Sequence, residues 1–120
     1  MLKYTYLLLF LKKSDCRYIL TNIVHIMRLA AATITYHPYI PSLMENIRRY
    51  IDGVDHLIIW DNTQYPMLEE KLGFDPATMG KISIMGTGEN VGIAYAANEA
   101  AEWADKNMFT HMLTMDQDSL

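Results

Sequence analysis

The sequence predicts an α/β fold with a mostly parallel sheet and helices on both faces. Four short apolar runs alternate along the chain with segments of helical spacing or helix-favouring composition. The first of these runs is nearly continuous, which is typical of a parallel strand that is buried on both faces. Polar, turn-forming residues follow the strands. The resulting order β-α-β-α-β-α-β calls for right-handed crossovers, which place the helices over the faces of the sheet.

The first strand and the first helix are predicted within residues 29–53. Residues 29–36 form an apolar run that ends at His37-Pro38, because proline lacks an amide donor and restricts the residue before it. Pro41 suits a first helical position, and Gly53 supplies the stop. Between them, apolar residues recur at helical spacing. This apolar face consists of Leu43, Ile47, Tyr50 and Ile51.

The second and third strands follow after short connections. Residues 56–60 form a buried strand, and the polar Asp61 lies directly past its end. A short helix is expected over residues 67–72. Residues 75–76 are expected to form a loop that leads to a third strand over residues 81–85.

The last helix and the last strand complete the alternation. An alanine-rich stretch predicts a helix from Val91 to about Lys106, with Glu102 and Lys106 at a supportive spacing. Residues 111–115 then form a fourth strand. The acidic motif Asp116-Gln117-Asp118 follows that strand directly.

The chain divides into an N-terminal extension, residues 1–26, and one partial domain, residues 27–120. The apolar stretch 4–11 is shorter than the about 20 residues that a membrane-spanning helix needs, which leaves peripheral membrane contact as an option. Either Met1 or Met27 is the natural start. The single cysteine favours a cytoplasmic location, because it allows no disulfide within the chain.

Charge and the acidic motif narrow the class of ligand. A formal net charge of -4 gives no general attraction for nucleic acid. Asp116 and Asp118 can face a common ligand just past a buried strand, and their oxygen atoms suit Mg²⁺ or Mn²⁺ equally. Such an ion can hold a diphosphate and stabilise a leaving group. A solvated acidic loop is the alternative, since short acidic pairs are common.

Four ordered motifs resemble those of the family 2 glycosyltransferases, over residues 29–120. They are ITYHP at 34–38, WDNT at 60–63, NVGIAYAAN at 90–98 and MDQDS at 115–119. The last is most similar to the bacterial rhamnosyltransferase branch. The resemblance implies a Rossmann-like GT-A fold, of which this chain would hold the nucleotide-sugar-binding half, truncated after the fourth strand. Glu99 departs from the family, in which a small residue commonly stands there.

The resemblance implies that the ends of the first two strands hold the nucleoside. Thr35, Tyr36 and His37 would form the wall that holds the nucleobase. Asp61 would hydrogen-bond the base or the ribose. Taken singly, Tyr36 is equally consistent with strand-end packing, and Asp61 with a turn.

The other two motifs would complete the donor site. Asn90 and Gly92 would shape the nucleotide pocket, although Asn90 alone is equally consistent with a helix cap or a turn. Asp116 would contact the ribose or reach the metal through water. Asp118 would ligate the Mg²⁺ or Mn²⁺ that holds the diphosphate.

The activity that the resemblance implies is that of an inverting hexosyltransferase. It would transfer a sugar, with rhamnose as one candidate, from a dTDP- or UDP-sugar to a saccharide or lipid-linked acceptor in cell-surface polysaccharide synthesis. In the family the acceptor half and the general base lie downstream of the acidic motif, so this chain alone would bind the donor without completing the transfer.

Other functions stay open from the sequence. A non-catalytic nucleotide-binding or interaction module, or an inactive gene remnant, is the main alternative. A receiver-like signalling domain fits less well, because Tyr36-His37 stands where that plan places an acidic pair. A dinucleotide-binding domain lacks its G-x-G-x-x-G after the first strand.

Overall fold

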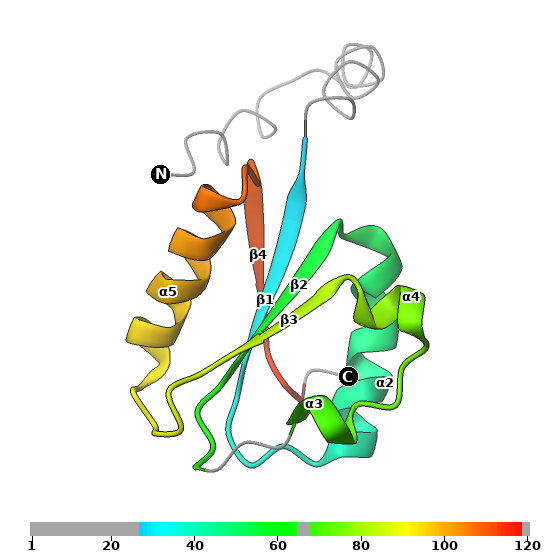
Figure 1. Cartoon of the computed structure of the whole chain (residues 1–120), viewed down its shortest axis with the longest axis vertical. Coiled ribbons are helices and arrows are strands. Elements are labelled where there is room, and N and C mark those ends of the chain that lie inside the picture. Colours follow the sequence, from blue (N-terminus) through cyan, green and yellow to red (C-terminus); the bar gives the residue numbers. More distant parts are fainter. Residues whose placement is uncertain (1–26, 65–67, 119–120) are drawn as a thin grey trace.

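Four parallel strands form the sheet of the computed structural model, which describes residues 27–64 and 68–118 (Figure 1). The extension 1–26, with the membrane contact expected of it, lies outside the described residues. The strands run in the order β3-β2-β1-β4. Their bounds are Leu29–Thr35 for β1, His56–Asp61 for β2, Ile82–Met85 for β3 and His111–Met115 for β4.

The strand order reverses once, between β1 and β4. The chain passes from β1 outward to β2 and then to β3, and it returns across β1 to place β4 on the other side. The register pairs Ala31 of β1 with Leu57 of β2 on one side and with Leu113 of β4 on the other. β1 and β2 are therefore the central strands, which agrees with their predominantly buried residues.

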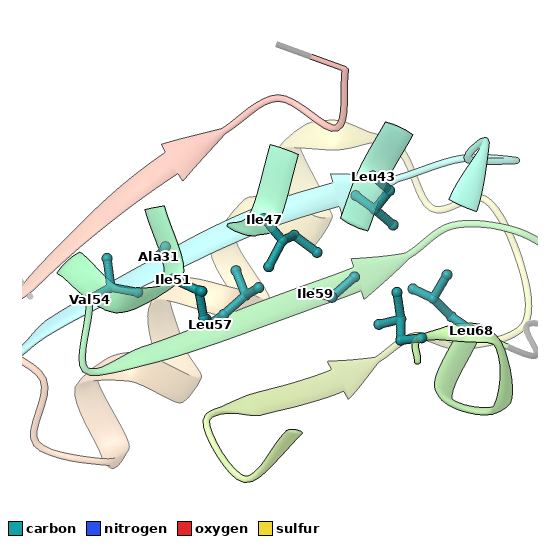
Figure 2. Close-up of a cluster of buried hydrophobic side chains, with 9 residues drawn as sticks. Ala31, Leu43, Ile47, Ile51, Val54, Leu57, Ile59 and Leu68 are labelled. Atoms are coloured by element: carbon teal, nitrogen blue, oxygen red, sulfur yellow. The ribbon is translucent and has the colours of Figure 1, made fainter. Parts of the chain in front are cut away.

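One face of the sheet packs against helices α2 (Ile40–Tyr50), α3 (Leu68–Lys71) and α4 (Pro76–Met79), with the 3₁₀ turn Ile51–Gly53 after α2. The predicted apolar stripe of α2 faces inward, because residues three and four apart lie on one side of a helix. Figure 2 shows this core between the helices and the sheet. Its buried residues are Ala31, Leu43, Ile47, Ile51, Val54, Leu57, Ile59, Leu68 and Leu72.

The opposite face packs against α5 (Ile93–Lys106). Ala100 and Ala104 of this helix lie against Ala30 and Ala32 of β1, and all four are at most 4% exposed. Small residues on both sides let the helix approach the strand closely. Helices therefore cover both faces of the sheet, as predicted (Figure 1).

An aromatic cluster closes the end of the molecule at which the strands begin. The rings of His56 and Trp103 stack with centroids 5.0 Å apart, and Phe109 packs against both. The guanidinium of Arg28 lies 4.3 Å from the centroid of the Phe109 ring. Ser83 Oγ lies 2.8 Å from Nε2 of His56. The cluster ties the starts of β2, β3 and β4 to the end of α5.

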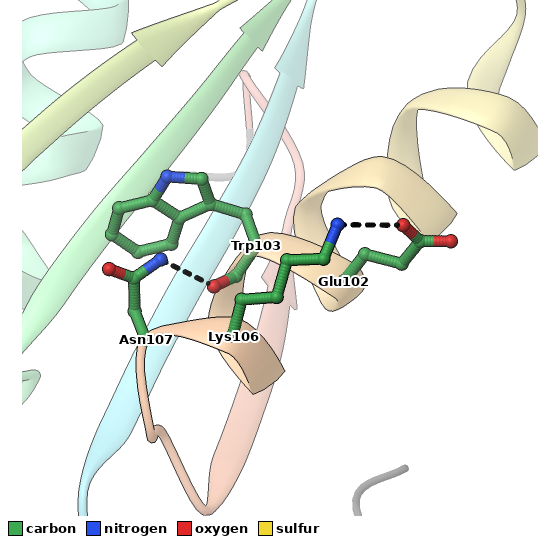
Figure 3. A network of polar contacts seen from close by, with 4 residues as sticks. All are labelled: Glu102, Trp103, Lys106 and Asn107. Carbon is green, nitrogen blue, oxygen red and sulfur yellow. Dashed lines mark hydrogen bonds and ion pairs between the residues drawn. The ribbon is translucent and has the colours of Figure 1, made fainter.

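The end of α5 is capped by main-chain bonds. Met108 has a φ of 65°, the Phe109 N–H donates to the Ala104 carbonyl, and the Met108 N–H donates to the Asp105 carbonyl. This pair of bonds is the Schellman motif. Figure 3 shows the last turn of α5, where Asn107 Nδ2 donates to the Trp103 carbonyl at 2.8 Å. The predicted Glu102–Lys106 pair is present at 3.5 Å, although both side chains are exposed and contribute little.

The prediction of a plain loop at residues 75–76 was wrong. Asp75 accepts a hydrogen bond from the Thr78 N–H at 3.4 Å, and Pro76 begins α4. An aspartate cap followed by proline at the first position favours a helix start. The helix predicted from Val91 begins at Ile93, because Gly92 has a φ of 84°.

Nowhere in residues 27–64 and 68–118 does a helix combine the length and the apolar character needed to cross a membrane.

Candidate functional site

The loops that follow the four strands gather at one edge of the sheet, because parallel strands end on the same side. In Figure 1 this edge is the lower end of the sheet. It carries every residue that the sequence predicts for the site. Side-chain hydrogen bonds connect the loops to one another, from the β4 end across β1 and β2 to the start of α5.

Asp61, the last residue of β2, joins the ends of the two central strands. It is 2% exposed, and its Oδ1 accepts hydrogen bonds from Thr35 Oγ1 and from the Thr63 N–H, both at 3.0 Å. Thr63 Oγ1 in turn accepts from the His37 N–H at 2.9 Å. Asp61 therefore holds the turn after β1 through two residues. Thr35 directly precedes the turn, and Thr63 accepts a hydrogen bond from it.

The turn after β1 presents two rings at the surface. Tyr36 is 51% exposed, and its ring meets the exposed His37 ring edge-on with centroids 4.4 Å apart. His37 has a φ of 43°, a left-handed conformation that costs free energy in a residue with a Cβ. The hydrogen bond that the His37 N–H donates to Thr63 Oγ1 helps to hold this conformation. Backbone strain of this kind is concentrated at functional sites in proteins.

Asn62 connects the β2 end to the start of α5. It is 3% exposed, and its Oδ1 accepts from Trp60 Nε1 at 3.0 Å and from the Val91 N–H at 3.3 Å. Its Nδ2 reaches the Gly92 carbonyl at 3.5 Å. Asn90 Oδ1 accepts from the Gly92 N–H at 3.0 Å, so Asn90 forms a turn before the helix while Gly92 occupies the cap position.

The acidic motif after β4 is held from two sides. Asn46 of α2 is 2% exposed and donates from Nδ2 to the Asp116 carbonyl at 2.9 Å. Gln117 accepts at Oε1 from the Tyr36 N–H at 2.9 Å, and its Nε2 donates to the Tyr36 carbonyl at 3.4 Å. The side chains of Asp116 and Asp118 are exposed. The motif therefore lies beside the turn after β1.

The exposed carboxylates of Asp116 and Asp118 would suit a metal ion that is also bound by the phosphates of a ligand. Among the described residues, no group of three or more His, Cys, Asp or Glu side chains is placed to hold a metal by itself. Mg²⁺ at nucleotide sites is usually bound by one or two carboxylates together with substrate phosphates and water. Asp116 and Asp118 fit that smaller requirement.

The loop after β3 approaches the site through a glycine. A Cβ on Gly86 would lie 2.5 Å from the carbonyl oxygen of Asp61, closer than van der Waals contact allows. Only glycine lets this loop pass so near the β2 end. Gly86 therefore sets the path of the chain toward Asn90 and Gly92.

Sequence reasoning missed four residues that organise the site: Asn46, Asn62, Thr63 and Gln117. Asn46 had a detectable signal, because it stands three residues after Leu43 and so interrupts the apolar face of α2. Asn62 and Thr63 directly follow the second strand, where polar residues of these types equally indicate an ordinary turn. The bond between Gln117 and Tyr36 joins residues 81 positions apart, so no local pattern indicates it.

Comparisons with protein-family models, with curated proteins and with solved structures gave no match. The fold itself is α/β, with an all-parallel sheet of four strands that is flanked by helices, and it is compatible with a Rossmann-like arrangement.

Proposed function

We propose that this chain forms the donor-binding part of an inverting family 2 glycosyltransferase with a GT-A fold. The observation that carries the proposal is the reversal of strand order between β1 and β4. In open parallel sheets, ligands bind beyond the carboxyl ends of the strands at such a reversal. Here that position holds the exposed Tyr36 ring and the acidic motif, joined by Gln117.

The proposed donor is a nucleotide-diphosphate sugar, with dTDP- and UDP-sugars as the candidates. The Tyr36 ring is half exposed, and a nucleobase would stack against it. The diphosphate needs a cation, because the chain carries a formal net charge of -4 and the motif itself is acidic. Asp116 and Asp118 would hold Mg²⁺ or Mn²⁺, and the ion would offset the charge that develops on the leaving diphosphate.

The hydrogen bonds of Asp61 and Thr63 would hold the turn that carries Tyr36 in its conformation. Asp61 fixes the turn at His37 through Thr63, and its burial makes this its main contribution to nucleotide binding in the proposal. Direct contact between Asp61 and the base or ribose would need the turn to open. Asn90 and Gly92 would border the nucleotide on the α5 side, at a position set by Asn62.

The reaction proposed for the whole enzyme is a single displacement. The acceptor hydroxyl attacks the anomeric carbon, the bond to the nucleoside diphosphate breaks, and a carboxylate takes the hydroxyl proton. We assign no general base among the described residues. The proposal for these residues is binding of the donor and the metal, and the acceptor is a saccharide or a lipid-linked saccharide.

Calorimetry with UDP and with dTDP, with and without Mn²⁺, tests the proposal. We expect at least one nucleotide to bind in a Mn²⁺-dependent manner. Asp118→Ala should weaken that binding by more than about 10-fold, because changes in groups that merely orient a metal ligand already cost about 10- to 100-fold. Asp52→Ala is the matched control, since Asp52 is exposed and lies before β2, at the opposite end of the sheet.

Binding that is equal with and without Mn²⁺, and unchanged by Asp118→Ala, would contradict the metal role. No binding of either nucleotide at any Mn²⁺ concentration would favour an interaction module or an inactive remnant over a donor site.

A further inference from the structure

The side chain of Gln117 makes the pair of hydrogen bonds that a neighbouring strand would make. Its Oε1 accepts from the Tyr36 N–H at 2.9 Å, and its Nε2 donates to the Tyr36 carbonyl at 3.4 Å. The two amide atoms cannot be exchanged, since a main-chain N–H only donates and a carbonyl only accepts. One side chain thus satisfies both main-chain groups of Tyr36.

These bonds begin where the main-chain ladder stops. The last register pair between β1 and β4 joins Thr33 to Met115. Beyond it, the backbone of the motif leaves the strand and bends. Gln117 continues the connection to β1 by its side chain, while Asn46 of α2 holds the Asp116 carbonyl at 2.9 Å. Two side-chain amides therefore set the position of the motif.

We propose that Gln117 is a positioning residue that couples metal binding at the motif to the turn that carries Tyr36. The inference rests on the proposed function, because it takes Asp116 and Asp118 as the metal ligands. A cation that draws these two carboxylates together moves the residue between them, and the two bonds of Gln117 pass that movement to Tyr36. Metal binding and nucleobase binding then change one another's affinity by the same factor, because coupling between two sites is reciprocal.

Titration with Mg²⁺ alone tests the coupling in the full chain. Main-chain amide signals of Tyr36 and Asp118 are followed by NMR in the ¹⁵N-labelled protein. We expect both signals to shift with the same apparent Kd. In Gln117→Met, which keeps the length of the side chain and loses both hydrogen bonds, Asp118 still responds, with affinity for Mg²⁺ lowered about 10-fold. The Tyr36 signal no longer responds.

Two further variants separate coupling from simple loss of structure. Gln64→Met makes the same chemical change at an exposed glutamine after β2, and it should preserve the Tyr36 response. Gln117→Glu keeps an acceptor for the Tyr36 N–H and loses the donor, so it should retain a reduced response. If Gln117→Met fails to fold, which its amide spectrum would reveal, Gln117→Glu carries the comparison.

The outcomes are distinguishable from failure of the proposed function. A wild-type titration in which Asp118 responds and Tyr36 does not overturns the coupling and leaves the metal role standing. A Tyr36 response that persists unchanged in Gln117→Met or in Gln117→Glu does the same. If neither amide responds to Mg²⁺, the metal role is itself wrong, and the coupling is wrong with it.

Discussion

Thr33 holds a buried hydroxyl at the centre of the sheet. The residue is 1% exposed, and within the described part of the chain its Oγ1 is buried without a hydrogen-bond partner. Leaving such a group unsatisfied costs about 1 to 3 kcal/mol. Thr33→Val keeps the shape and removes the hydroxyl, so we expect the free energy of unfolding to rise by about 1 kcal/mol. Urea denaturation measures the change, and a clear loss of stability would show that the hydroxyl is satisfied in solution.

His56 makes the stability of the fold depend on pH. Burial lowers its pKa below the usual value, and the positive charges of Arg28 and Lys81 lower it further. The unfolded chain therefore takes up a proton near pH 6.5 while the folded chain does not. The contribution of His56 to the free energy of unfolding is full above pH 6.5. It falls as the pH drops from there toward the lower pKa of the folded state, and it changes no further below that pKa.

Urea denaturation between pH 7.5 and pH 5 measures this effect. His56→Gln cannot titrate at this position, so its stability should fall less over the same range than that of the wild type. The remaining histidines are common to both proteins, and the difference between the two profiles isolates His56. Identical profiles would refute the assignment.

At the scale of the element, the end of α5 offers a stabilising change. Met108 lies in the left-handed region with a φ of 65°, and the residue is 74% exposed, so its side chain contributes little packing. Met108→Gly removes the Cβ that this conformation disfavours. We expect a gain of about 0.5 to 1 kcal/mol in the free energy of unfolding, after the greater flexibility of glycine in the unfolded chain is subtracted.

Met108→Ala is the matched control for this change, since alanine shortens the side chain and keeps the Cβ. Thermal unfolding of the two variants separates the effect of backbone conformation from that of the side chain. Equal stability of Met108→Gly and Met108→Ala would mean that the conformation carries no cost.

The elements themselves were largely predictable from sequence. Each strand starts and ends within one residue of its predicted bounds, because apolar runs between turn-forming residues leave little freedom in where a buried strand stops. The helix α4 was missed because Asp75-Pro76 is compatible with both a turn and a helix start. The choice depended on Thr78, whose N–H donates to the Asp75 side chain.

At the scale of the whole molecule, the order of the strands in the sheet could not be predicted from local sequence patterns. Parallel pairing and covered faces follow from apolar runs and connection lengths, but the placement of β4 beside β1 depends on how complete faces pack. The candidate site likewise has a part that local sequence patterns indicate and a part that they do not. Its residues at strand ends could be picked from sequence, whereas the contacts that assemble them, such as Asn46 with Asp116 across 70 positions, needed the folded chain.

The aromatic cluster has a consequence for how this protein can vary. His56, Trp103 and Phe109 fasten the molecule where the strands begin, and the candidate site lies where they end. A substitution in this cluster reaches the loops at the other end only through the length of the sheet and of α5. We therefore expect substitutions in the aromatic cluster to change the free energy of unfolding while the geometry of the candidate site stays nearly the same, because the two lie at opposite ends of the strands.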